Sequence, residues 1–214
     1  MFNKLEIANF RNDSFLNDFE KQNELCVKYG LFGISIYPVF LSDLSTDMPH
    51  GNIYVNIDNI IPRYEISLYK NIAESIISKY NMISGFNIPV NTNRGINKRQ
   101  LGDFIDYCMF SGKNPRICLD INYLFEEYDF KMIIQQFEKI KCTDIAIFYS
   151  NKKDFDLSNM IISAAWVLKN TGMNVSLFGK FSKKVLEMPI FSEKKIRSIG
   201  GSSSNIYNIL NESV

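Results

Sequence analysis

The stretch Ile196–Ser204 has the most specific chemistry in the chain, because an apolar segment ends there in glycines and hydroxyls. The polar end consists of Gly200, Gly201, Ser202 and Ser203. Glycine lets backbone N–H groups approach a ligand closely, and serine adds hydroxyl donors. A helix starting at Asn205 would add N–H groups without internal partners, which suit a phosphate. We therefore predict an anion-binding turn, with Gly179 and Lys180 as its other half; a turn without a ligand is the alternative.

Polar side chains also recur near the ends of several apolar segments, at positions two residues apart. Residues so spaced share one face of a strand. The predicted substrate pocket is lined by Tyr37, Asn56, Asn87, Asn91 and Ser176. Asp120 and Asp58 are candidate proton carriers if burial raises the pKa of one of them, with Tyr149 polarising a substrate carbonyl. Structural, hydrogen-bonded carboxylates are an equal alternative for the two aspartates.

Zinc and thiol chemistry find little support in the sequence. The cysteines are widely scattered: Cys26, Cys108, Cys118 and Cys142. No CxxC pair is present, and His50 is the only histidine. A Ser–His or Cys–His nucleophile would depend on that one side chain, in a loop-like segment. We expect reduced, buried thiols, no metal site and no cofactor.

Composition indicates a globular protein with one sizeable core. The chain has 214 residues, 46% of them hydrophobic and 22% charged, with a formal net charge of +1. That balance gives no general electrostatic case for binding nucleic acid or an anionic membrane. No apolar run is long enough to span a bilayer, and the first residues lack a secretion-type apolar segment. We expect a single domain over residues 1–214, located in the cytoplasm.

The elements that must position these residues alternate along the chain. The predicted strands are Leu5–Phe10, Phe32–Val39, Asn52–Asp58, Gly85–Asn91, Arg116–Asn122, Asp144–Ser150, Asn174–Gly179 and the segment from Ile196. The predicted helices are Leu16–Tyr29, Tyr69–Tyr80, one capped by Asn97, Met132–Ile140, one capped by Ser158, Lys183–Glu187, and one beginning at Tyr207–Leu210. Parallel strands need such crossovers. Eight strands favour a closed α/β barrel of the (β/α)8, or TIM, type with its site at the carboxyl ends of the strands, and an open doubly wound sheet is the alternative.

In this order and spacing the chain resembles the deoxyribose-phosphate aldolase family over nearly its whole length. The segments Leu16–Pro38, Asn87–Asn91 and Arg116–Asp120 look like the family's first helix and strand, its fourth strand and its fifth strand. The segment Ser198–Ser203 looks like the family's phosphate turn. The resemblance implies a TIM barrel of the class I aldolase superfamily and phosphate binding.

The same resemblance implies that the family's reactive lysine is missing. The family forms an imine on a lysine of the sixth strand, and Ile147 stands at the matching position. A second lysine matches Ser176, and a catalytic aspartate matches Asn87. The family's Asp-His-Thr of the first strand has no counterpart in Leu5–Phe10. An imine needs a primary amine, which neither Ile147 nor Ser176 supplies.

These observations lead to two function hypotheses from different classes. The first is an aldolase-like barrel that binds a small phosphorylated sugar or aldehyde, with carbon–carbon lyase or isomerase chemistry that does not use the family's lysine. The second is a catalytically inactive barrel that acts as a regulatory or partner-binding subunit, as a homo-oligomer or with an active relative. Metal-dependent aldol chemistry is the weakest alternative, because histidines do not cluster.

Overall fold

Eight parallel strands form a closed barrel in the order β1-β2-β3-β4-β5-β6-β7-β8. A computed structural model describes residues 2–8, 19–43, 51–57, 66–90, 97–121, 127–149 and 156–211. The strands are β1 Leu5–Ala8, β2 Gly33–Ile36, β3 Asn52–Asn56, β4 Gly85–Val90, β5 Asn114–Asp120, β6 Asp144–Phe148, β7 Asn174–Phe178 and β8 Ile196–Gly201. Pairing of β1 with β8 closes the ring, which confirms the predicted TIM barrel and makes the open-sheet alternative wrong.

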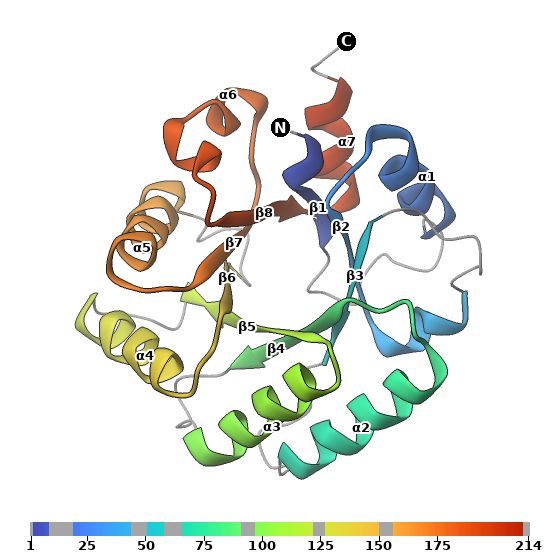
Figure 1. Cartoon of the computed structure of the whole chain (residues 1–214). Helices are drawn as coiled ribbons and strands as arrows, with labels where there is room; N and C mark the ends of the chain where they lie inside the picture. The colour runs from blue at the N-terminus through green and yellow to red at the C-terminus, as the bar shows by residue number, and fades with distance from the viewer. Residues whose placement is uncertain are drawn as a thin grey trace.

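Helices surround the ring of strands on the outside (Figure 1). The α-helices are α1 Phe19–Tyr29, α2 Ile66–Lys79, α3 Lys98–Phe110, α4 Glu127–Lys139, α5 Leu157–Asn170, α6 Lys183–Leu186 and α7 Ser203–Asn211. The described residues also form the 3-10 helices η1 Phe2–Lys4, η2 Pro38–Asp43 and η6 Pro189–Ser192. Each parallel strand needs a return segment across the barrel wall, and these helices supply it.

Side chains alternate along each strand between the outer and the inner face of the barrel wall, and the two faces differ in chemistry. Outward residues such as Ile34, Val55 and Ile117 pack with the helices in one large apolar cluster. Inward residues include buried polar and charged side chains, among them Glu6 and Arg116. Strands of a parallel barrel are covered on both sides, so they carry nearly continuous apolar runs in which an inward charge stands out.

Some predicted boundaries differ from the observed ones for local physical reasons. β2 ends at Ile36, because Pro38 begins a 3-10 helix and cannot donate to a strand ladder. Asp156, not Ser158, caps α5: its Oδ1 accepts from the N–H groups of Ser158 at 2.9 Å and Asn159 at 3.2 Å. The last helix begins at Ser203, two residues before Asn205 and four before Tyr207, the two starts predicted for it.

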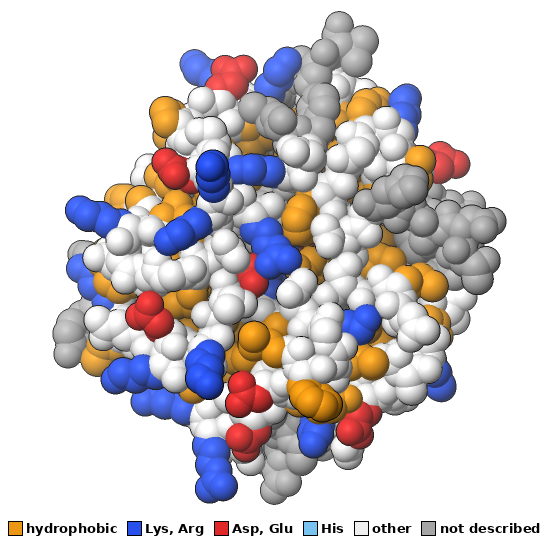
Figure 2. All heavy atoms as spheres, viewed as in Figure 1, with side chains coloured by type: hydrophobic (Ala, Val, Ile, Leu, Met, Phe, Trp, Pro, Cys, Tyr) orange, Lys and Arg blue, Asp and Glu red, His pale blue; other side chains and the backbone are white. Residues whose placement is uncertain are grey.

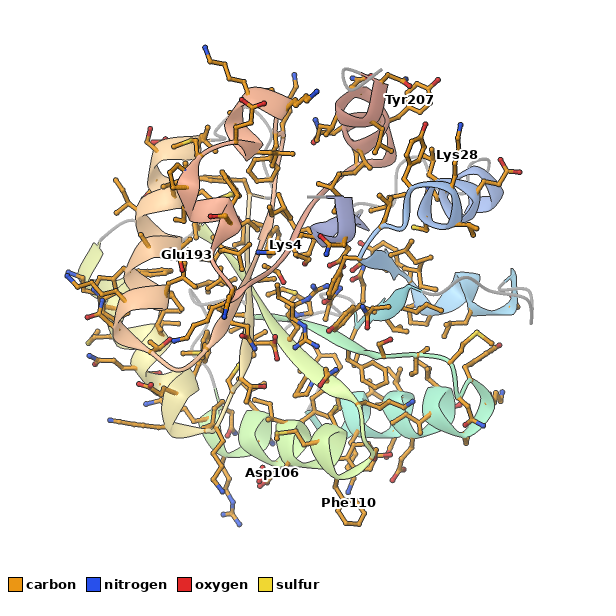
Figure 3. The ribbon with its side chains drawn as sticks, turned by 45° about the horizontal axis from the view of Figure 1, so that its top comes forward. Lys4, Lys28, Asp106, Phe110, Glu193 and Tyr207 are labelled. Carbon is orange, nitrogen blue, oxygen red and sulfur yellow. The ribbon has the colours of Figure 1, made fainter. Side chains whose placement is uncertain are left out.

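Lys4 ties the closing seam of the barrel to the segment before β8. Its Nζ donates to the carbonyl oxygens of Glu193 at 2.8 Å and Phe191 at 3.3 Å, and Figure 3 shows Lys4 and Glu193 side by side.

On the face seen in Figure 2, basic and acidic side chains are interspersed with apolar ones, so no patch of one sign dominates it. Within the described residues, the model contains no helix with the length and apolarity needed to cross a membrane.

Candidate functional site

An ion pair lies at the centre of the barrel interior, joining strands on opposite sides of the ring. Glu6 comes from β1 and Arg116 from β5, and both side chains are fully buried. Arg116 Nη2 donates to Glu6 Oε1 at 2.7 Å, and Nη1 donates to Oε2 at 2.8 Å. This bidentate geometry fixes both groups, and charge-assisted bonds of this kind are among the strongest in proteins.

Hydroxyl and amide groups from five other strands surround the ion pair. These groups belong to Ser35, Asn56, Asn87, Ser176 and Ser198. Arg116 Nε donates to Asn87 Oδ1 at 2.7 Å, while the serine Oγ atoms accept from Nη1 and Nη2 at 3.1 to 3.2 Å. Glu6 also accepts from Ser35 at 2.5 Å and from Ser198 at 2.7 Å. All five N–H donors of the guanidinium and both carboxylate oxygens are therefore engaged.

Two aromatic rings complete the surroundings of the guanidinium. Arg116 Cζ lies 4.0 Å from the ring centroid of Tyr54 and 4.9 Å from that of Phe178. Gly85 leaves room for the first ring, because a Cβ there would lie 2.9 Å from Tyr54 Cε1. Burial raises the pKa of Tyr54, and the charge of Arg116 lowers it by less. The network is therefore packed on its sides as well as hydrogen-bonded.

The electrostatics of the pair favour both charges in spite of burial. Burial alone would raise the pKa of Glu6, but the charge of Arg116 and the hydrogen bonds from Arg116, Ser35 and Ser198 together hold that pKa below its ordinary value. Burial alone would lower the pKa of Arg116, yet the carboxylate of Glu6 raises it above its ordinary value. Both groups remain ionised, so neither is poised to exchange a proton near neutral pH.

Three residues of the predicted pocket belong to this network. Asn87 Nδ2 donates to Asn56 Oδ1 at 2.6 Å and to Ser35 Oγ at 2.8 Å. Ser176 Oγ lies 2.9 Å from Ser198 Oγ. The structure thus places Asn56, Asn87 and Ser176 around Arg116. Their part in holding a substrate stays a prediction.

The ion pair itself was missed in the sequence, although a signal was present. Glu6 interrupts the apolar segment Leu5–Ala8, and Arg116 directly precedes the apolar run Ile117–Leu119 within β5. A charge inside a strand covered on both sides must find a partner. Opposite charges in two such strands therefore point to each other.

An apolar layer lies on the carboxyl side of the network. It consists of Ala8, Cys118, Ala146, Phe148 and Phe178, which pack together apart from the outer core. Ala8 follows Glu6 by two residues on β1, and Cys118 follows Arg116 by two on β5, so they are the next inward positions. On β1 and β5 the layer therefore lies closer to the carboxyl ends of the strands than the ion pair does.

The position of Ile147 corrects one expectation drawn from the family resemblance. Ile147 is paired with Leu119 and Leu177, and it packs in the outer apolar cluster against the helices. The interior positions of β6 are Ala146 and Phe148. A shift of one residue moves a side chain to the other face of a strand, so Ile147 does not occupy the place of an inward lysine. In the described structure, none of the eight strands carries a lysine.

The candidate catalytic residues are not all brought together. Asp120 ends β5 on the interior side and is 6% exposed. Tyr149 packs against the outer apolar cluster; burial raises its pKa, as do the carboxylates of Asp156 and Asp120, against hydrogen bonding that lowers it. Tyr37 is buried in the same cluster. Asp58 and Asn91 lie outside the described residues.

The β7–β8 end of the barrel brings the two halves of the predicted anion turn together. Gly179 N donates to Gly200 O at 2.9 Å, and a Cβ on Gly201 would lie only 2.6 Å from Gly179 O. Ser202 directly precedes α7, and its Oγ accepts from Asn205 N at 3.4 Å. Lys180 is exposed beside this contact. For Ser203, the backbone lies in the first turn of α7.

Asn205 holds this arrangement by bridging α7 to the segment after β7. Its Nδ2 donates to Phe181 O at 2.8 Å, and its Oδ1 accepts from Phe181 N at 3.2 Å. The same Oδ1 lies 2.8 Å from the position of a Cβ on Gly201. The side-chain amide thus fixes Gly179–Phe181 against Gly201. In the first turn of a helix such as α7, the N–H groups have no internal acceptor.

The cysteine thiols are poor nucleophiles at neutral pH. Cys26, Cys108, Cys118 and Cys142 are all free and buried. Burial raises the pKa of each to about 12, so the reactive thiolate is scarce at neutral pH. Among the residues that the structure describes, no group of three or more His, Cys, Asp and Glu side chains is placed to hold a metal ion.

Comparisons with known proteins show the fold. No family model matches the chain, and no curated protein matches it by sequence. A tetrameric deoxyribose phosphate aldolase from Aeropyrum pernix superimposes with a TM-score of 0.78 at 12% identity, covering 99% of this chain and 90% of its own. The aldolase QR15 gives a TM-score of 0.73 at 13% identity, covering 99% and 95%. A putative deoxyribose-phosphate aldolase from Coccidioides immitis gives 0.67 at 10%, covering 100% and 85%. The chain is thus a TIM barrel similar in fold to deoxyribose-phosphate aldolases.

Proposed function

We propose that this barrel binds a small phosphorylated metabolite, a sugar or an aldehyde, at the carboxyl ends of β7 and β8. The observation that carries the proposal is the contact between Gly179 and Gly200–Gly201, held together by Asn205. The Ser202 hydroxyl and the start of α7 offer O–H and N–H donors to a phosphate beside this contact. The exposed ammonium of Lys180 supplies the counter-charge.

Any lyase or isomerase chemistry at this site proceeds without the family's imine. The absence of lysine from the described strands supports this, because an imine lysine must project into the interior. Asp120 is the proton carrier best supported by position, since it ends β5 on the interior side. Asp58 and Tyr149 remain the other proposed catalytic groups.

Phosphate binding is tested by thermal shift and calorimetry with inorganic phosphate. Lys180→Ala is expected to weaken binding roughly fivefold to tenfold, because one charge-assisted contact is lost. Lys169→Ala, which removes a lysine from the last turn of α5, is the matched control and keeps wild-type affinity. No phosphate-dependent stabilisation of the wild-type protein would refute the proposed site.

The imine is tested separately with borohydride in the presence of short aldehydes. The expected mass spectrum contains no stable adduct on any lysine. An adduct on Lys180, or on a lysine outside the described residues, would overturn the part of the proposal that concerns chemistry and leave phosphate binding intact.

The second candidate is a catalytically inactive barrel that acts with a partner subunit. The observation that favours it is the buried Glu6–Arg116 pair, whose donors and acceptors are already hydrogen-bonded to one another and to neighbouring side chains. Phe110 is 93% exposed at the end of α3, next to Met109, and projects away from the barrel in Figure 3. Measuring the molecular size of the protein, by itself and mixed with candidate partners, separates the two hypotheses. A strict monomer that turns over sugar phosphates excludes the inactive barrel.

A further inference from the structure

The hydroxyl of Tyr54 is a buried polar group for which the described residues supply no hydrogen-bond partner. The side chain is fully buried, and its ring centroid lies 4.0 Å from Arg116 Cζ. Most buried polar atoms in proteins have a partner, because leaving one without a hydrogen bond costs free energy. Tyr54 Oη therefore marks a place in the barrel where a further group is expected.

Tyr54 lies on the amino-end side of the network around Arg116. It precedes Asn56, a member of that network, by two residues on β3, so both side chains take the inner face and Tyr54 is nearer the start of the strand. Its ring stacks with that of Phe32, the residue before β2, at a centroid distance of 6.4 Å. The Tyr54 ring thus belongs to the end of the barrel opposite the proposed phosphate site.

A second ion pair lies at the same end of the barrel. Arg197 in β8 donates from Nη1 to Oδ1 of Asp144, the first residue of β6, at 2.6 Å. Burial has the largest effect on the pKa of Tyr54 and raises it; among the smaller effects, the charge of Arg197 lowers that pKa and the charge of Asp144 raises it. The pair is therefore close enough to the Tyr54 hydroxyl to interact with it electrostatically.

Arg197 brings solvent and unused donors to this end of the barrel. Its side chain is 25% exposed, and within the described residues only Nη1 has an acceptor, so Nε and Nη2 are available. The Tyr54 O–H and these N–H groups are all donors, so the group that completes them is an acceptor. Because Asp144 already neutralises Arg197, a neutral acceptor fits better than an anion, whose charge would have no partner of its own.

We propose that the amino end of the barrel binds an ordered water molecule that accepts hydrogen bonds from Tyr54 Oη and from Arg197. The same molecule can donate to the carboxylate of Asp144, which gives it the three hydrogen bonds typical of a buried water. Solvent that reaches the exposed part of Arg197 supplies it. The site is independent of the proposed phosphate site, and it hydrates the barrel interior from the opposite end.

A crystal structure of the wild-type protein, at a resolution that shows ordered water, tests the site directly. We expect density for one water at about 2.8 Å from Tyr54 Oη and within reach of Arg197, and no such density in Tyr54→Phe. Its absence from the wild-type protein would overturn the proposal. A soak in bromide separates the two classes of acceptor, because anomalous density at the site would identify an anion and overturn the neutral ligand.

The sign of a stability change tests the same site in solution. Tyr54→Phe removes a hydroxyl that the water satisfies, so the equilibrium constant for unfolding should rise about fivefold. An unchanged or smaller constant would contradict the bound water, because a buried hydroxyl without a partner costs stability and its removal relieves that cost. Tyr207→Phe is the matched control: this side chain on α7 is 52% exposed, so the constant should stay as in wild type.

A pair of backgrounds ties the water to Arg197. Arg197→Met removes the second donor, so Tyr54→Phe in that background should change the unfolding constant by less than about twofold. Lys195→Met, which removes a hydrogen bond to Thr171 O just before β8, should keep the fivefold effect. An equal effect of Tyr54→Phe in the two backgrounds would overturn the water as a link between Tyr54 and Arg197.

Discussion

At the residue scale, the molecule depends most on Arg116 and Glu6, because burying two charges is costly unless every donor and acceptor is satisfied. Here the guanidinium engages Glu6, Asn87 and three serine hydroxyls, and two rings lie beside it. We predict that Arg116→Met or Glu6→Leu alone costs about 3–5 kcal/mol, since each leaves one charge unpaired. The double variant should cost less than the sum of the singles, as measured by urea unfolding. Additive effects would show that the pair is not coupled.

The lowered pKa of Glu6 predicts how stability depends on pH. In the fold this pKa lies below the ordinary value of 4.5, so the unfolded chain binds the proton more readily. The contribution of Glu6 to stability is therefore fully present above that ordinary value and is lost as pH falls through the folded pKa. Urea midpoints measured from about pH 7 down to about pH 3 should fall less steeply for Glu6→Gln than for wild type. Parallel curves would assign the acid sensitivity to other carboxylates.

Sequence reasoning at this scale found residue types but not their partners. Asn87 and Ser176 were predicted to point inward, and they do. Strand periodicity fixes which face a side chain takes, but not how far along the barrel axis it meets another strand. That height depends on the stagger between strands, which no local pattern encodes. The Glu6–Arg116 contact, across 110 positions of sequence, is therefore the feature that reading by segments does not find.

At the scale of elements, β8 depends on a glycine where a side chain would collide with two neighbours. A Cβ on Gly200 would lie 2.5 Å from the Phe178 ring and 2.7 Å from Glu6 O. The backbone oxygen belongs to the adjacent strand and cannot move away cheaply. We predict that Gly200→Ala destabilises the protein by about 1–3 kcal/mol, from overpacking. Gly172→Ala, where no atom lies within 4 Å, is the matched control and should be close to neutral in thermal unfolding.

Asn205 is the element-scale link between α7 and the segment after β7. Asn205→Ala removes both hydrogen bonds to Phe181, so Gly179 and Lys180 are no longer fixed against Gly201. We predict that this variant loses most of its phosphate-dependent stabilisation in a thermal shift assay. Asn170→Ala, which removes one exposed hydrogen bond to Trp166 O at the end of α5, should retain it. Equal phosphate responses in the two variants would show that Asn205 serves only the fold.

The bounds of a helix were predictable where the spacing of its apolar residues and its capping residue agreed. They were less predictable where two residues could both serve as the N-cap. For α3, Asn97 caps the helix, and the buried face matches the apolar spacing of Leu101, Phe104, Ile105 and Cys108. For α5, Asp156 and Ser158 are both good N-cap residues. The carboxylate of Asp156 accepts two backbone N–H groups and sets the start two residues earlier than predicted. The backbone conformation, not the residue type, decides between them.

At the scale of the whole molecule, closure of the barrel was predictable because the count and rhythm of strands leave few alternatives. Closure has a thermodynamic consequence, since no strand has a free edge and β1 pairs with β8. The central network adds a link across the ring, joining β1 with β5 and, through serines, with β2, β7 and β8. Loss of any one strand would expose the ion pair and the outer core together.

We therefore predict that the chain unfolds as one cooperative unit, in line with the single domain predicted over residues 1–214. Urea transitions followed by the fluorescence of Trp166 on α5, the one tryptophan of the sequence, and by far-ultraviolet circular dichroism should coincide. Arg116→Met should shift both transitions by the same amount, although Arg116 lies on β5 and Trp166 on a helix outside the ring. Two separate transitions, or a shift in only one probe, would divide the barrel into parts that fold independently and would contradict an ion pair that couples the whole ring.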